Sequence, residues 1–174
     1  TNTKYVGCYQ AIKDKMGIFE LFKKRYPQFS IFNSNNSLFS FKASAFVDTA
    51  LEFGVNFFDH ADIYGGGKSE EVFGKAISNF NRENIIIQTK CGIRQGQYDF
   101  SYDHIINSVS GSLKRLGTEY IDVLLLHRPD ALMEPEEVAR AFSYLKENGM
   151  VRNFGVSNHN PYQIKLLQNA LDMP

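Results

Sequence analysis

The chain has 174 residues, of which 43% are apolar, 14% aromatic and 22% charged, a composition that predicts a soluble globular unit and excludes disordered and fibrous chains. The 19 Lys and Arg residues balance the 19 Asp and Glu residues, so we expect no basic surface for nucleic acid or an anionic membrane. The longest aliphatic run, Val123 to Leu126, is far shorter than the roughly 20 residues that cross a bilayer.

The residue composition and its pattern change near residue 42, and this change divides the chain into two predicted parts. Residues 1–42 form an atypical N-terminal segment to which no fold is assigned; it ends in a Ser/Asn run. Apolar spacing favours a helix around residues 18–24. The side chains of residues 33–36 favour a loop, because Asn and Ser compete for backbone hydrogen bonds. Residues 43–174 form the second part.

From residue 43 onward, short apolar runs alternate with helical periodicity, and this rhythm predicts an α/β fold. Phe46, Ala50 and Phe53 mark one helical face, and Gly54 follows as the residue that ends the helix. Further helices are expected around residues 70–76, 101–117, 135–149 and 161–171. The expected strands are 55–59, 85–90, 120–127 and 151–156.

The spacing of these strands favours a parallel sheet, because a strand plus a crossover helix takes roughly 30 to 36 residues. Periodicity alone leaves an open sheet and a (β/α)8 barrel as alternatives. A complete barrel of eight such units needs about 250 residues. The chain is long enough for only part of one.

Polar side chains lie at or directly after the end of each predicted strand, at the edge where parallel α/β folds place their sites. These residues are Asp59, Lys90, His127, and Ser157 with Asn158. Each alone is equally typical of a structural residue, such as a helix cap or a solvated lysine. Together they favour a functional site.

The charges of these residues suggest a chemistry. Lys90 at the end of a buried strand needs a counter-charge, and Asp59 on the neighbouring strand is the natural partner. Tyr64 lies in the loop that leaves the same strand as Asp59. A nearby cation lowers the pKa of a phenol, so Tyr64 is a candidate general acid for a carbonyl oxygen, which His127 could also hydrogen-bond.

The order and spacing of several segments resemble the aldo-keto reductase family, and within it the bacterial YdhF-like oxidoreductase branch. The segments that resemble the family are residues 56–65, 68–70, 88–90, 124–129 and 154–158, and those that resemble the branch are residues 127–130 and 133–138. The resemblance implies a (β/α)8 TIM barrel that reduces aldehydes or ketones with NADPH. It implies four catalytic residues: Asp59, Tyr64, Lys90 and His127. Tyr64 would donate the proton, Lys90 would lower its pKa, Asp59 would hold Lys90, and His127 would orient the substrate.

The same resemblance implies that Ser157 and Asn158 bind the nicotinamide carboxamide. It also places residues 43–174 in the N-terminal portion of the barrel, so we expect the C-terminal part, with half of the cofactor site, to be missing. The residues leave two main functions open, an active reductase and a non-catalytic fragment or binding module. A third alternative, a lyase that uses Lys90 as a Schiff-base amine, is disfavoured by the spacing of Asp59 and Tyr64. An open barrel would also expose edges for self-association.

Other signals are weaker. The glycine-rich run at residues 65–69 lacks the spacing of a phosphate-binding loop and is interpreted as an active-site loop. Cys8 and Cys91 have no zinc-site spacing, and His60 and His104 have no ligand-like spacing either, so we expect no metal. The cysteine pattern is typical of a reducing compartment. No secretory signal is expected, and the predicted location is cytoplasmic, with a small-molecule carbonyl substrate as partner.

Overall fold

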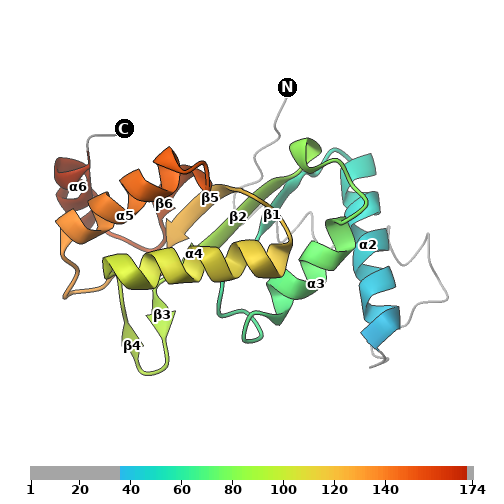
Figure 1. Ribbon diagram of the computed structural model, residues 1–174, viewed down its shortest axis with the longest axis horizontal. Coiled ribbons are helices and arrows are strands. Elements are labelled where there is room, and N and C mark those ends of the chain that lie inside the picture. The colour runs from blue at the N-terminus through green and yellow to red at the C-terminus, as the bar shows by residue number, and fades with distance from the viewer. Residues whose placement is uncertain (1–35, 172–174) are drawn as a thin grey trace. The chain divides into compact units, whose positions relative to one another are not determined.

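The computed structural model describes residues 36–171 of the chain (Figure 1). Backbone contacts divide the described residues into two compact units. The first unit comprises residues 36–57 and Val72–Ile85, and the second comprises Phe58–Glu71 and residues 86–171. Every residue predicted for the site falls in the second unit.

The first unit contains helix α2, Asn36–Glu52, which covers the predicted helix before Gly54. Gly54 has a φ of +77°, a left-handed conformation that ends a helix at low cost only when the residue is glycine. The Ser44 hydroxyl donates a 3.1 Å hydrogen bond to the backbone oxygen of Ala76. Among residues 43–52, the part of α2 whose side chains the structure describes, Ala45, Val47, Thr49 and Ala50 are buried.

The predicted loop is wrong at its last residue, Asn36, because α2 already begins there. Asn is as compatible with a helix start as with a loop, and an established helix extends cooperatively toward its N-terminus. Residues 33–35 and the predicted helix at 18–24 lie outside the described residues. The boundary near residue 42 stays a prediction, and α2 runs through that position.

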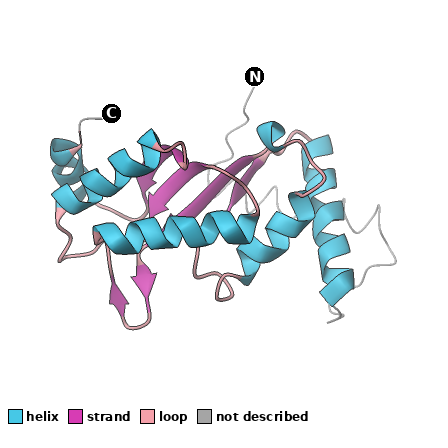
Figure 2. Ribbon diagram, viewed as in Figure 1, coloured by secondary structure: helices cyan, strands magenta, loops and turns pink. Residues whose placement is uncertain are grey.

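The second unit is built on a parallel sheet with the strand order β1-β2-β5-β6 (Figure 2). Its strands are β1 Phe57–Asp59, β2 Ile86–Cys91, β5 Ile121–Leu126 and β6 Val151–Val156. Strand β2 pairs in parallel with β5, and β5 pairs in parallel with β6. These strands confirm the four predicted ones, as buried parallel strands read as apolar runs.

Three predicted helices of this unit are confirmed: α4 Tyr102–Leu116, α5 Pro135–Glu147 and α6 Pro161–Ala170. The Ser101 side chain caps the first turn of α4, and Gly117 ends that helix in the left-handed conformation. Helix α4 packs against β2, and α5 packs against β6. Within residues 36–171, no helix has the length and apolar character needed to cross a membrane.

The remaining predicted helix is α3, Lys68–Ile77, of which residues 68–71 belong to the second unit and residues 72–77 to the first. A short 3-10 turn of the first unit, η1 Arg82–Asn84, precedes β2. A small antiparallel hairpin was not predicted. It consists of β3 Ile93–Arg94 and β4 Gln97–Tyr98. Strands of two residues are too short to show an alternating apolar pattern, which is why sequence reasoning missed them.

Gly92 allows the chain to turn between β2 and this hairpin, and we expect Gly92→Ala to be strongly destabilising. Its φ is +106°, and a Cβ there would overlap the ring of the buried Phe100. Backbone strain and overpacking together should lower the free energy of unfolding by about 3 kcal/mol, measured by urea denaturation.

The matched control is Gly96→Ala in the same hairpin. Gly96 also has a positive φ, +78°, but a Cβ there would meet no atom within 4 Å. The control should therefore lose only about 1 kcal/mol to backbone strain. Equal losses of unfolding free energy in Gly92→Ala and Gly96→Ala would show that the overlap with the Phe100 ring does not destabilise the fold.

Candidate active site

The predicted site residues lie at the carboxyl ends of the strands. Asp59 is the last residue of β1, and Lys90 is the last but one of β2. His127 and Ser157 directly follow β5 and β6. Backbone hydrogen bonds continue the ladder beyond the strands: from Asp62 N–H to Lys90 O (3.0 Å), from His127 N–H to Cys91 O (2.9 Å) and from Ser157 N–H to Leu126 O (2.9 Å).

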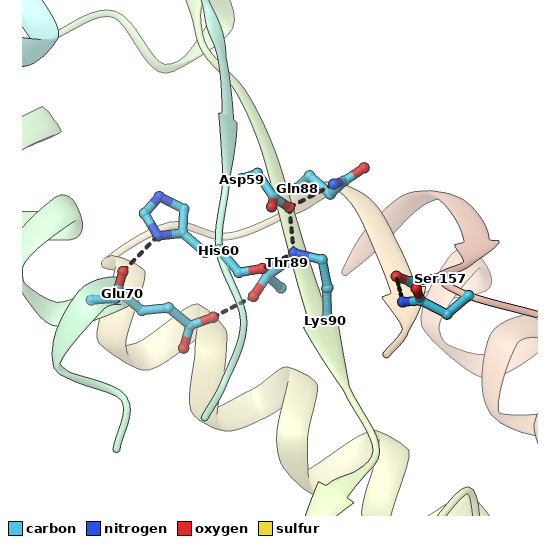
Figure 3. A network of polar contacts seen from close by, with 9 residues as sticks. Asp59, His60, Glu70, Gln88, Thr89, Lys90 and Ser157 are labelled. Atoms are coloured by element: carbon cyan, nitrogen blue, oxygen red, sulfur yellow. Dashed lines mark hydrogen bonds and ion pairs between the residues drawn. The ribbon is translucent and has the colours of Figure 1, made fainter. Parts of the chain in front are cut away.

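The predicted ion pair between Lys90 and Asp59 is present (Figure 3). Lys90 Nζ lies 2.5 Å from Asp59 Oδ1 and donates a second hydrogen bond, of 2.8 Å, to the backbone oxygen of His60. The lysine side chain is 8% exposed, whereas that of Asp59 is 42% exposed. The carboxylate therefore compensates a nearly buried cation while keeping contact with water.

Tyr64 lies beside this ion pair. Lys90 Nζ is 5.2 Å from the centroid of the Tyr64 ring, within the range of a cation–π contact. The loop that carries Tyr64 is folded back on itself, since Ser69 N–H and Gly67 N–H both donate to Tyr64 O. Tyr64 is 39% exposed, so a small molecule can reach it.

His127 completes the group of four. Its ring meets the Tyr64 ring edge to face, with centroids 5.8 Å apart and an interplanar angle of 78°. Burial lowers the pKa of His127, and the cations of Lys90 and Arg128 lower it further. The imidazole is therefore neutral at neutral pH. Its Nδ1 is buried and has no hydrogen-bond partner among the described residues.

Ser157 and Asn158 form a separate pair at the end of β6. Asn158 Nδ2 donates a 2.7 Å hydrogen bond to Ser157 Oγ, and Asn158 has a φ of +64°, a left-handed conformation that Asn tolerates better than most residues. Figure 3 draws no hydrogen bond from Ser157 to Lys90 or Asp59. The structure thus brings four of the six predicted residues into direct contact.

Sequence reasoning missed Gln88 as a member of the site. Gln88 Nε2 donates a 2.6 Å hydrogen bond to Asp59 Oδ1, the oxygen that also receives Lys90 (Figure 3). The sequence could have indicated this role, because Gln88 and Lys90 are two residues apart on a predicted strand and residues at that spacing face the same side. Gln88 and Lys90 together hold the Asp59 carboxylate.

Sequence reasoning also did not single out Asp62, which lies in the loop that carries Tyr64. Burial raises the pKa of Asp62 to about 6, and the negative charge of Glu70 adds to the effect, which Arg115 opposes. The folded state therefore holds the Asp62 proton more tightly than the unfolded chain does. As pH rises from about 4 to 6, this group lowers the free energy of unfolding.

We expect Asp62→Asn to gain stability relative to the wild type across that window, because the amide does not ionise. The gain between pH 4 and 6.5 should be about 1 to 3 kcal/mol, measured by urea unfolding at each pH. The matched control is Asp48→Asn, at an exposed position of α2. A pH-independent difference, or the same slope in the control, would contradict the assignment.

Cys91 and the histidines give no sign of a metal centre. Burial raises the pKa of the Cys91 thiol, with a smaller contribution from Asp62, so the residue acts as a small apolar side chain. No three His, Cys, Asp or Glu side chains within residues 36–171 form a group that could hold a metal. Cys8 lies outside the described residues.

Comparisons with known proteins agree with this arrangement. The sequence model of the Aldo/keto reductase family matches residues 29–174. The chain is 47% identical over 137 residues to Uncharacterized oxidoreductase YcsN of Bacillus subtilis (strain 168), and 46% identical over 137 residues to Oxidoreductase YdhF of Escherichia coli (strain K12). These matches cover 72% and 73% of this chain and 46% of each relative.

Solved structures give the same result. The aldo-keto reductase AKR11C1 from Bacillus halodurans (holo form) matches with a TM-score of 0.69 and 36% identity, over 77% of this chain and 47% of that chain. The fold is therefore of the TIM-barrel type, and the chain spans 46% of the length of the two curated relatives. The predicted resemblance to the YdhF-like oxidoreductases is confirmed. The chain belongs to the aldo/keto reductase family.

Proposed function

We propose that the chain carries the catalytic residues of an NADPH-dependent carbonyl reductase, which converts an aldehyde or ketone into an alcohol. One observation carries the proposal: a single ammonium, Lys90 Nζ, contacts both the Asp59 carboxylate and the Tyr64 ring. The names of the relatives support the class of reaction, since YcsN and YdhF are both described as oxidoreductases.

Tyr64 is the proton donor in this proposal. Its phenol gives a proton to the carbonyl oxygen as negative charge develops there, and solvent returns the proton afterwards. The Lys90 cation stabilises the charge that remains on the phenol oxygen. Asp59 and Gln88 keep the ammonium in place, because Asp59 Oδ1 accepts a hydrogen bond from each of them.

His127 orients the substrate. A neutral imidazole can donate a hydrogen bond to the carbonyl oxygen without competing with Tyr64 for the proton. The low pKa of His127, caused first by burial and then by Lys90 and Arg128, keeps the ring neutral at working pH. The His127 and Tyr64 rings meet edge to face with centroids 5.8 Å apart, close enough for both side chains to bond the same carbonyl oxygen.

Ser157 and Asn158 fit the carboxamide of a nicotinamide ring. One hydroxyl and one amide provide donors and acceptors that match a primary amide, and both residues lie just past a strand end. When bound there, NADPH would supply the hydride that the carbonyl carbon gains, while Tyr64 supplies the proton. Preference for NADPH over NADH is part of this proposal.

The proposed function is tested by following NADPH absorbance at 340 nm with the purified chain and a simple aldehyde, alongside a fluorescence titration with NADPH. We expect saturable binding and aldehyde-dependent oxidation, weaker with NADH. Binding without turnover would favour the alternative of a non-catalytic binding module. Absence of binding at millimolar NADPH would refute the proposal for this chain.

We also propose a cytoplasmic location and association between copies of the chain. Strand β6 is at one end of the strand order in the described sheet and pairs with β5 alone. An unpaired strand edge supports association between chains.

A further inference from the structure

A buried ion pair lies behind the candidate site. Glu70, in the first turn of α3, is completely buried. Its Oε2 accepts a 2.7 Å hydrogen bond from Arg115 Nε, and its Oε1 accepts one of 2.6 Å from the Thr89 hydroxyl. A buried carboxylate is stable only when its oxygens are paired in this way. Glu70 thus joins α3, α4 and β2.

We propose that Glu70 is a positioning residue that holds the Tyr64 loop and the Lys90 strand in the arrangement needed for catalysis. The inference rests on the proposed function, because it concerns the geometry of the same site. Glu70 touches none of the four proposed catalytic residues directly. It acts through Thr89 on one side and through Arg115 on the other.

Thr89 transmits the effect to Lys90. Successive residues of a strand point to opposite faces, so Thr89 faces Glu70 while Gln88 and Lys90 face Asp59 (Figure 3). Strand β2 is therefore held by a carboxylate on each face. Loss of the bond behind the strand would free the segment that places the Lys90 ammonium.

Arg115 transmits the effect to the Tyr64 loop. A Cβ on Gly67 would lie 2.8 Å from Arg115 Cδ, and one on Gly111 would lie 2.9 Å from Arg115 Nη1. The arginine therefore packs closely against the backbone of both glycines, one in the loop and one in α4. The His60 ring and the Ser69 hydroxyl, 3.1 Å apart, close the base of the same loop. Displacing Arg115 would release the loop on the side next to Tyr64.

A matched pair of variants at Thr89 tests the proposal. Thr89→Val keeps the volume but removes the hydroxyl from Glu70, whereas Thr89→Ser keeps the hydroxyl. We expect Thr89→Val to lower kcat about tenfold while the KM for NADPH stays within about twofold, since an unpaired buried acceptor loosens the site without touching the cofactor pair. Thr89→Ser should restore kcat.

Hydrogen–deuterium exchange gives a readout that does not depend on activity. The amides of residues 61–69 should exchange about tenfold faster in Thr89→Val than in the wild type or in Thr89→Ser. The amides of α5 should be unchanged, which shows that the variant is folded. If Thr89→Val does not fold, Arg115→Lys, which keeps the charge but lacks the Nε donor, should show the same local exchange.

The outcomes separate the two proposals. A wild-type chain that never oxidises NADPH refutes the proposed function, and the exchange data then still decide whether Glu70 positions the loop. Wild-type exchange of residues 61–69 in both Thr89→Val and Arg115→Lys would overturn the positioning role. Equal loss of kcat in the Val and Ser variants would overturn it as well, because side-chain shape rather than the hydroxyl would then be responsible.

Discussion

Tyr64→Phe should reduce the rate of carbonyl reduction by about 10²- to 10⁴-fold, the usual contribution of a general acid, and leave NADPH binding nearly unchanged. The substitution removes only the phenol oxygen. The ring keeps its contacts with His127 and with the Lys90 ammonium, so the loop should retain its conformation. The rate of NADPH oxidation and a fluorescence titration measure the two quantities separately.

Tyr162→Phe is the matched control, because Tyr162 is 87% exposed and lies in α6. It should behave as the wild type in both measurements. If Tyr64→Phe lost activity and NADPH binding to the same degree, the residue would be needed for folding rather than for proton transfer. Full activity in Tyr64→Phe would show that the Tyr64 hydroxyl is not the proton donor.

Lys90→Met should lower the rate by about 10²- to 10³-fold, because the cation that stabilises the developing phenolate is lost from a partly buried site. The effect on stability should be moderate. Asp59 keeps its hydrogen bond from Gln88 and stays 42% exposed, so water can solvate the remaining carboxylate. The lost hydrogen bond to the backbone oxygen of His60 should lower the free energy of unfolding by about 1 to 3 kcal/mol, measured by urea denaturation.

Lys68→Met provides the control for charge removal near the same loop. Lys68 is 72% exposed in its side chain and pairs with Glu71 at 2.6 Å. An exposed pair of this kind contributes little, so the variant should retain full activity. Equal rates in Lys90→Met and Lys68→Met would show that the cation beside Tyr64 has no role in the reaction.

Much of the fold could be predicted from local patterns. Ser101 and Gly117 bound helix α4 where expected, since capping residues and a left-handed glycine act on the backbone next to them. The pairing of Lys90 with Asp59 could also be predicted. A cation at the end of a buried strand needs an anion nearby, and parallel strands bring their carboxyl ends to one edge.

The long-range contacts behind the sheet could not be predicted. Glu70 and Arg115 are 45 residues apart, and each has the sequence context of an ordinary surface residue of an amphipathic helix. Only the folded chain brings Glu70, Thr89 and Arg115 together and so decides which of these polar residues become buried. The raised pKa of Asp62 depends on the same packing, because burial is its main cause.

The proximity of Lys90 and Tyr64 is the central feature of the proposed site, and nuclear Overhauser spectroscopy on the labelled chain measures it directly. The structure places Lys90 Nζ 5.2 Å from the Tyr64 ring centroid. Cross-peaks are therefore expected between the ε-methylene protons of Lys90 and the ring protons of Tyr64. Assigned resonances that show no such cross-peaks, with Lys90 contacting other residues instead, would contradict the proposed site.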